Sequence, residues 1–176
     1  NGSKILDIAS KTGEFAVAIC AKLEKLGLRK EIFSKSILSI PTSTVAYEFI
    51  RRIYEELGLD LSCIAKHFTT YDLITVKDNN KKVDYQKISS ILRQYKPFNS
   101  ITLNDTVNEG DKNVKIDAIV GNPPYQITAK GDAKGADPIY HLFMEISKNV
   151  GNQTTLIHPG RFLFNAGKTP KDWNKK

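Results

Sequence analysis

The sequence lacks any long hydrophobic run. It has no stretch of about 18 consecutive apolar residues, so we expect no segment that spans a membrane. The chain also begins with Asn1 rather than Met and has no positively charged, then apolar leader. From this start we expect the sequence to be a piece of a longer protein.

Cysteine is scarce as well. Cys20 and Cys63 both lie in apolar, helix-like surroundings, which argues against a disulfide framework and favours a reduced, cytoplasmic protein. Cys63 and His67 are spaced to share one helix face, but a zinc site needs two further ligands at comparable spacing. The sequence shows none, so we expect no metal.

Acidic residues are outnumbered by basic ones, 19 against 26, and the formal net charge is +7. A positive field favours a nucleic acid or another polyanion as partner. A lysine-rich solvated surface would give the same composition, so charge alone does not choose between the two. At 176 residues and 40% hydrophobic content, we expect one domain with one core.

Strand and helix patterns alternate along the chain. Short apolar runs typical of buried strands lie at residues 4–9, 36–40, 100–103, 116–120 and 154–157. Helical spacing of apolar residues occupies the intervals at residues 15–26, 46–57, 88–95 and 139–150. Gly27 and Gly58 are expected stops, and Thr42, Ser43 or Thr44 is the expected N-cap of the second helix. Repeated strand–helix units predict an α/β fold with a mostly parallel sheet and helices on both faces.

Residues 59–97 form a longer connection than a strand–helix–strand unit needs. We expect an ordered excursion in which the helix at residues 88–95 packs at the edge of the sheet. The polar run at residues 77–82 is expected to be an exposed turn or loop.

Polar clusters follow several of the expected strands. They are residues 7–13, Asn104-Asp105, Asn122-Pro123-Pro124-Tyr125 and His158-Pro159-Gly160. Ligands of open parallel sheets bind outside the carboxyl ends of the strands, so these clusters are expected to meet on one rim.

The run Asn122-Pro123-Pro124-Tyr125 has a chemistry of its own. Pro124 fixes its φ and holds Pro123 extended, which makes the loop stiff, and proline has no N–H to compete as a donor. The Asn122 side-chain oxygen and the Pro123 carbonyl can therefore accept both hydrogens of one amino group. Tyr125 offers a ring on which a planar base can stack. A stiff turn with an exposed tyrosine is the structural alternative.

Asn-Pro-Pro-Tyr after a buried strand resembles the catalytic motif of S-adenosylmethionine-dependent adenine-N6 DNA methyltransferases. The segments ILDIASKTG, IPTSTVAYEFIRRIYE, HFTTYDLI, GNPPYQ and HPGRFLFNAGKTPKDWNKK, in this order, resemble a branch found in restriction–modification proteins. The resemblance covers nearly the whole chain. It implies a three-layer Rossmann-like methyltransferase fold for residues 1–176, with S-adenosylmethionine as cofactor and duplex DNA as partner.

The resemblance also implies roles for single residues. The loop from Asp7 to Gly13, with Ala9 and with Phe15 packed beside it, would hold the methionine end of the cofactor. Asp105 would accept a hydrogen bond from the cofactor adenine. The target adenine would be held by Asn122, Pro123, Pro124 and Tyr125, and Asn122 also lies against the cofactor.

The chain departs from the family pattern at two positions. Lys11 stands where a glycine is usual, so its side chain must point away from the ligand. No acidic residue follows the strand at residues 36–40 to hold the ribose hydroxyls, and Glu48 is the nearest candidate in sequence.

Two other functions fit the same motifs. Enzymes that methylate a protein glutamine amide use Asn-Pro-Pro-Tyr in the same way, and a non-catalytic DNA-binding module would keep the fold without the cofactor. The chain stops just after the strand that ends at His158. We therefore expect a partial catalytic domain without its target-recognition region, which works with a fused or separate nuclease and target-recognition domain.

Overall fold

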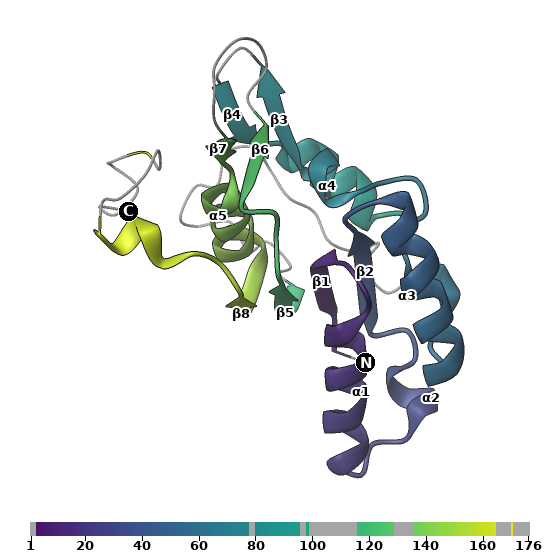
Figure 1. Ribbon diagram of the computed structural model, residues 1–176. Coiled ribbons are helices and arrows are strands. Elements are labelled where there is room, and N and C mark those ends of the chain that lie inside the picture. Colours follow the sequence, from purple (N-terminus) through teal and green to yellow (C-terminus); the bar gives the residue numbers. More distant parts are fainter. Residues whose placement is uncertain are drawn as a thin grey trace.

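A four-stranded parallel sheet forms the centre of the protein. The structure is a computed structural model that describes residues 3–77, 80–95, 98, 116–128, 136–164 and 170. The strands are β1 (Ile5–Ser10), β2 (Ile37–Pro41), β5 (Ile116–Gly121) and β8 (Gly151–Leu156), in the spatial order β2-β1-β5-β8 (Figure 1). Each neighbouring pair is parallel. The predicted parallel sheet is confirmed.

Helices connect these strands, and two small hairpins stand apart from the sheet. The helices are α1 (Glu14–Lys25), α2 (Lys30–Phe33), α3 (Thr44–Leu57), α4 (Tyr85–Leu92) and α5 (Tyr140–Val150). Short 3-10 helices are η1 (Leu61–Cys63), η2 (Thr70–Leu73) and η4 (Gly160–Phe164). The antiparallel hairpins are β3 (Ile74–Lys77) with β4 (Asn80–Val83), and β6 (Gln126–Thr128) with β7 (Ala136–Pro138).

The alternation of side chains along the strands separates two cores. Leu6, Ile8 and Ile40 belong to the cluster that includes the buried residues of α4 and α5. Ile37 belongs to the cluster formed with α1, α2 and α3, and Ile5 packs against it. Since successive side chains of a strand point to opposite faces, the two clusters lie on the two sides of the sheet. The fold is therefore a three-layer, Rossmann-like α/β fold.

Local sequence signals define the helices on the α1–α3 side. Gly13, with φ of 78°, precedes α1, and Gly27, with φ of 79°, follows its end at Lys25. The hydroxyl oxygen of Ser43 accepts a hydrogen bond from the Ala46 N–H at 3.1 Å and caps α3. Gly58, with φ of 66°, ends α3. The expected stop at Gly58 and the expected cap at Ser43 are confirmed.

The excursion after α3 differs from its prediction in two ways. Residues 77 and 80–82 are not a loop but parts of the strands β3 and β4. The helix begins at Tyr85 rather than at Ile88, and its buried apolar side chains belong to the same core cluster as Leu6, Ile8 and Ile40. The reason is that Leu6, Ile8 and Ile40 present an apolar surface that needs cover, and Ile88 and the other apolar side chains of α4 supply it. The strand expected at residues 100–103, and Asn104 and Asp105 after it, lie outside the described residues.

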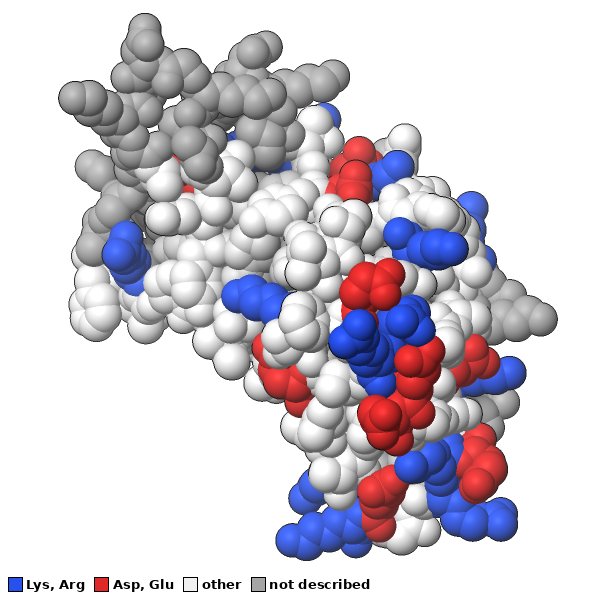
Figure 2. Space-filling model, turned by 45° about the vertical axis from the view of Figure 1, so that its right-hand side comes forward, with Lys and Arg blue, Asp and Glu red and all other residues white. Residues whose placement is uncertain are grey.

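The surface over α1–α3 carries charges of both signs close together (Figure 2). On α3, the guanidinium of Arg51 pairs with Glu48 at 3.1 Å and with Glu55. Such interleaved charges cancel at a distance, so the net charge of +7 does not produce a basic field on this face. No helix in the described part of the chain is both long and apolar enough to cross a membrane.

Candidate functional site

The carboxyl ends of β1 and β5 lie side by side. Asp7 is opposite Val120 in this parallel pair, and Gly121 follows next to Ile8. A Cβ at Gly121 would lie 2.9 Å from Cγ2 of Ile8 and 3.4 Å from the Ala9 nitrogen. Glycine at this position therefore allows the two strand ends to approach closely.

Three of the four predicted polar clusters meet along this edge. Residues 7–13 lie at the end of β1, and residues 122–125 follow β5. The Ile157 N–H donates to the Gly121 carbonyl at 2.9 Å, which brings His158 to the same edge at the end of β8. The fourth cluster, Asn104-Asp105, lies outside the described residues, as does the role expected for Asp105.

Asp7 is a buried carboxyl group in the middle of the sheet. It has no exposed surface, and Oδ1 accepts a hydrogen bond of 3.4 Å from the Ala9 N–H. Burial raises the pKa of Asp7 to about 7, although the Ser10 side chain and the Ala9 N–H lower it and Glu14 raises it further. The carboxyl group therefore keeps its proton to a higher pH than an exposed aspartate does, and a cation beside it would favour the ionised form.

The turn between β1 and α1 contains the exposed residues Lys11 and Thr12 and the buried Gly13. Gly13 adopts a left-handed conformation, and a Cβ there would lie 3.1 Å from Cγ2 of Ile53. The Thr12 hydroxyl and N–H both donate to Oε2 of Glu14, at 2.7 and 3.1 Å. Burial raises the pKa of Glu14, but these hydrogen bonds outweigh it and the pKa is lowered. Lys11, which stands where the family pattern has glycine, is exposed.

The loop after β5 is anchored at both ends and open at the tyrosine. Asn122 is half-buried, Pro123 is buried and Pro124 is half-buried, whereas the Tyr125 side chain is 39% exposed. The Tyr125 carbonyl accepts a hydrogen bond of 3.0 Å from the Ile139 N–H. A stiff loop therefore presents an aromatic ring to solvent beside a sheltered amide.

Buried oxygen atoms without hydrogen-bond partners gather at this edge. Asp7 Oδ2, Ser10 Oγ and Asn122 Oδ1 are inaccessible to solvent and bond to no atom in the described part of the chain. A buried acceptor without a partner costs free energy, and such atoms concentrate where a ligand supplies the missing donors. Two carbonyl-type acceptors and one hydroxyl fit a ligand that carries amino groups, one of them cationic.

A pocket of about 240 Å³ opens at the end of β2. It is lined by Pro41, Ser43, Thr44, Tyr47, Ala65, Lys66, His67, Phe68 and Thr69. The Thr42 N–H donates to the Ser10 carbonyl at 3.0 Å, which joins this pocket to the end of β1. Hydroxyl groups and two aromatic rings in a small concave site suit a nucleoside.

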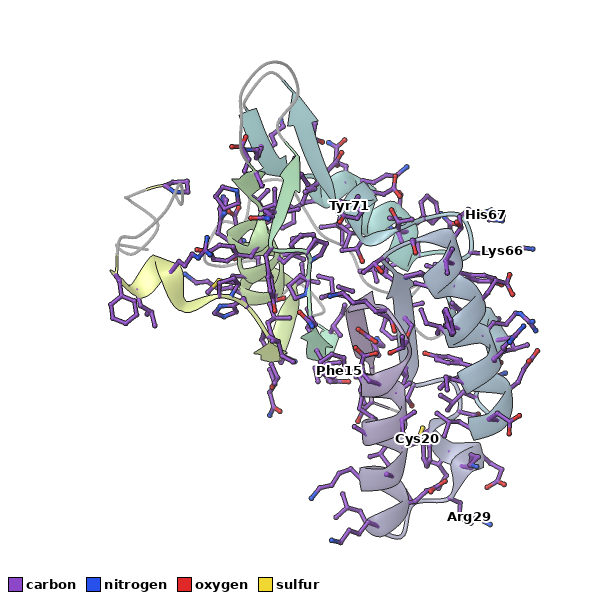
Figure 3. All side chains as sticks on the ribbon, viewed as in Figure 1. Phe15, Cys20, Arg29, Lys66, His67 and Tyr71 are labelled. Carbon is purple, nitrogen blue, oxygen red and sulfur yellow. The ribbon has the colours of Figure 1, made fainter. Side chains whose placement is uncertain are left out.

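The far wall of this pocket comes from a segment that runs beside β2. Ile64 forms a parallel bridge with Ser39, and the Ala65 N–H donates to the Ser39 carbonyl at 2.9 Å. The loop that follows therefore emerges at the same edge as the ends of β1 and β2. Lys66 and His67 project from it (Figure 3), and both side chains are exposed.

The sequence did not single out this pocket or the buried Ser10 hydroxyl. The segment HFTTYDLI belongs to the resemblance, and the apolar pair Ile64-Ala65 just before it is the sequence signal that could have indicated its place beside β2. Glu48 lies on the exposed side of α3, paired with Arg51, and does not reach the pocket. The lining contains no carboxylate, in agreement with the missing ribose acid.

The cysteines take no part in this site. Cys20 and Cys63 are buried free thiols, and the Cys20 sulfur lies between α1 and α3 (Figure 3). Cys63 ends a 3-10 helix and His67 lies in the loop beyond, so the two do not share a helix face. In the described ranges, no group of three His, Cys, Asp or Glu side chains is arranged to hold a metal ion.

Comparison with known proteins gives one match. Residues 47–176 match the family model described as Eco57I restriction-modification methylase; the match spans most of the chain, including most of α3 and the Asn-Pro-Pro-Tyr loop. Searches of curated proteins and of solved structures each found no match. The parallel sheet, the buried acceptors at its carboxyl edge and this match agree, and the chain belongs to the Eco57I restriction-modification methylase family.

Proposed function

We propose that this protein transfers a methyl group from S-adenosylmethionine to the N6 amino group of an adenine flipped out of duplex DNA. The observation that carries the proposal is the buried Oδ1 of Asn122, which has no hydrogen-bond partner in the described structure. It stands at the end of β5, one strand away from the buried Asp7. The neutral acceptor suits the amino group of the target base, and the ionisable carboxyl group suits the ammonium group of the cofactor.

Asn122, Pro123, Pro124 and Tyr125 are the proposed catalytic residues. Oδ1 of Asn122 and the Pro123 carbonyl accept both hydrogens of the target amino group, which directs the nitrogen lone pair toward the methyl group. Pro124 keeps this loop rigid, and the exposed ring of Tyr125 stacks on the flipped base. Catalysis of this kind depends on positioning and on fixed dipoles.

The residues around β1 fit the proposed cofactor. Bound S-adenosylmethionine would supply an activated methyl group on a sulfonium. Its ammonium group matches the buried carboxyl of Asp7, and the backbone of Ala9 and Gly13 with the half-buried Phe15 completes the methionine side. The pocket at the end of β2 would take the adenosine, with Ser43, Thr44 and Tyr47 replacing the usual acid. Asp105 keeps its proposed role as acceptor for the cofactor adenine.

Extrusion of the target base is part of the proposal. The amino group of a base stacked inside a duplex cannot be brought to acceptors in the loop after β5, so the base must be flipped out. Stacking on Tyr125 offsets part of the unstacking cost, by about 1–3 kcal/mol. A nuclease and a target-recognition region, fused or separate, would complete the restriction–modification system.

The test combines product analysis with cofactor titration. The full-length protein is incubated with tritiated S-adenosylmethionine and duplex DNA, and the DNA is digested to nucleosides for mass spectrometry. N6-methyladenine is the expected product. Label in cytosine, or in a glutamine of an added release-factor-like protein instead of DNA, would refute the adenine assignment. Calorimetric titration that detects no cofactor binding would favour a non-catalytic DNA-binding module.

A further inference from the structure

The excursion between α3 and α4 contacts both halves of the proposed site. At one end, the Thr70 hydroxyl is fully buried and donates to the Ile8 carbonyl at 2.9 Å. Ile8 lies directly after Asp7 on β1. At the other end, the hairpin β3–β4 reaches the hairpin β6–β7, and β6 begins directly after Tyr125. Figure 1 shows the two hairpins side by side above the sheet.

An ion pair joins the two hairpins. Nζ of Lys81 on β4 lies 2.7 Å from Oδ2 of Asp137 on β7, across 56 positions of sequence. The two side chains are only 16% and 20% exposed. Solvent screens a sheltered pair much less than a surface pair, so loss of the Lys81 ammonium should weaken the link between the two hairpins.

Asp137 is linked to Tyr125 through the backbone. It stands opposite Ile127 in the β6–β7 ladder, and two residues further on the Ile139 N–H donates to the Tyr125 carbonyl. Tyr125 is therefore held by the strand that carries Asp137. A shift of β7 changes the position of the Tyr125 carbonyl and, with it, the direction of its ring.

We propose that the Lys81–Asp137 ion pair positions Tyr125 for the target base. This inference rests on the proposed function, because it assigns Tyr125 to the base. Lys81 is a positioning residue that touches neither substrate nor cofactor. The segment between α3 and α4 is longer than a strand–helix–strand connection needs. In this proposal it acts as a brace that holds the catalytic loop in place, because it contacts β1 through Thr70 and the β6–β7 hairpin through Lys81.

Lys82 provides a matched control. It is the next residue of β4, it is exposed, and it faces Thr75 across the β3–β4 ladder. Lys81→Met and Lys82→Met remove the same charge and the same ammonium group from adjacent positions of one strand. Lys81→Arg keeps the charge, and the double variant Lys81→Asp with Asp137→Lys reverses the pair.

The experiment measures steady-state methyl transfer to duplex DNA, cofactor affinity by calorimetry and amide hydrogen exchange at Ile139 in the full-length protein. Lys81→Met is expected to lower kcat by roughly 10- to 100-fold through misplacement of the ring. Cofactor affinity should stay within about twofold. The exchange of the Ile139 amide should accelerate. Lys81→Arg and the reversed pair should recover most of the lost rate, and Lys82→Met should match the parent.

Two results would overturn the inference. Equal behaviour of Lys81→Met and Lys82→Met would remove the ion pair from any positioning role. Parallel losses of transfer, cofactor affinity and thermal stability, without recovery in the reversed pair, would make Lys81 a general stabiliser. If the parent protein methylates no adenine at all, the proposed function fails, and the exchange rate at Ile139 alone then decides whether Lys81 holds the loop.

Discussion

The ends of β1 and β5 are neighbours in one sheet, yet they offer opposite kinds of acceptor. The end of β1 holds a carboxyl group with no exposed surface and a pKa of about 7, surrounded by backbone and hydroxyl groups. The end of β5 holds a neutral amide between glycine and proline, followed by an exposed ring. In the described structure, the end of β1 has two buried oxygens without a partner, Asp7 Oδ2 and Ser10 Oγ, and the end of β5 has one, Asn122 Oδ1.

This difference supports the proposed placement of the cofactor at the end of β1 and of the target base at the end of β5. A carboxyl group that ionises near neutral pH attracts a cation, which suits the ammonium group of the cofactor. An amide oxygen does not ionise, so it can accept a hydrogen bond from a neutral amino group without favouring the protonated form of that group. Mutations at the two strand ends should therefore separate cofactor binding from methyl transfer.

The largest effect is expected from Asn122→Ala. It removes the acceptor that holds the amino group in the transition state, so transfer should fall by about 10²–10³-fold, as when an oxyanion-hole donor is lost. Cofactor affinity should stay within about threefold, because the main contacts of Asn122 go to the base. Tritium incorporation into duplex DNA and calorimetry measure the two quantities. Asn152→Ala, at an exposed asparagine on β8, is the control. If Asn122→Ala transfers methyl groups at near the parent rate, Asn122 does not hold the target amino group.

Asp7→Asn should give the complementary result. It keeps the shape and removes the charge, so cofactor affinity should weaken by about 10- to 100-fold, or about 1.4–2.7 kcal/mol. Methyl transfer at saturating cofactor should fall much less. Asp117→Asn, at an exposed carboxyl on the same sheet, serves as the control in the same titration. An unchanged affinity in Asp7→Asn would show that the cation binds elsewhere.

The same carboxyl group should make stability depend on pH. The pKa of Asp7 is about 7 in the folded protein and 3.8 ordinarily, so the folded state keeps a proton that the unfolded state loses between these values. The free energy of unfolding should therefore fall as pH rises from about 4 to about 7. Denaturant titrations across this range should give a smaller decrease for Asp7→Asn than for the parent. Identical pH profiles would contradict the burial of an uncompensated carboxyl.

The smallest effect is expected from Tyr125→Phe. Stacking needs the ring and not the hydroxyl, so transfer should remain within about threefold of the parent. Tyr125→Ala should lose most of the activity, and its lower affinity for DNA with a mismatched target base would show that the ring holds the base. A large loss in Tyr125→Phe, seen in the same tritium assay, would instead give the hydroxyl a chemical role.

The central sheet could be predicted because its signals are local. The strands β1 and β5 are short apolar runs ended by polar residues, and Ser43 and Gly58 delimit α3 by their side chain and backbone chemistry. The strand β8 begins at Gly151, three residues before its expected start at Thr154. Its polar residues Asn152 and Gln153 are exposed at the edge of the sheet, so hydropathy gave no sign of them.

The pocket and the brace could not be predicted because they depend on distant contacts. Nothing in the sequence near Lys81 indicates that Asp137 is its partner. The bridge between Ile64 and Ser39 joins residues that no short-range pattern connects. The chemistry of the Asn-Pro-Pro-Tyr run is enough to predict a stiff loop after β5. The burial of the Asn122 side-chain oxygen cannot be predicted in the same way, because it depends on the position of β5 between β1 and β8.

If Asn122 and Pro123 hold the target amino group as proposed, this pair of acceptors at the end of β5 also determines when the reaction stops. Asn122 Oδ1 and the Pro123 carbonyl together require two hydrogens on one nitrogen, and proline supplies no N–H that could substitute for either. A methylated amino group has a single hydrogen left, so it leaves one of the two oxygens unpaired. The product is therefore held less tightly than the substrate, which favours its departure and blocks a second methylation. The same loop rejects a base that presents a carbonyl oxygen instead of an amino group.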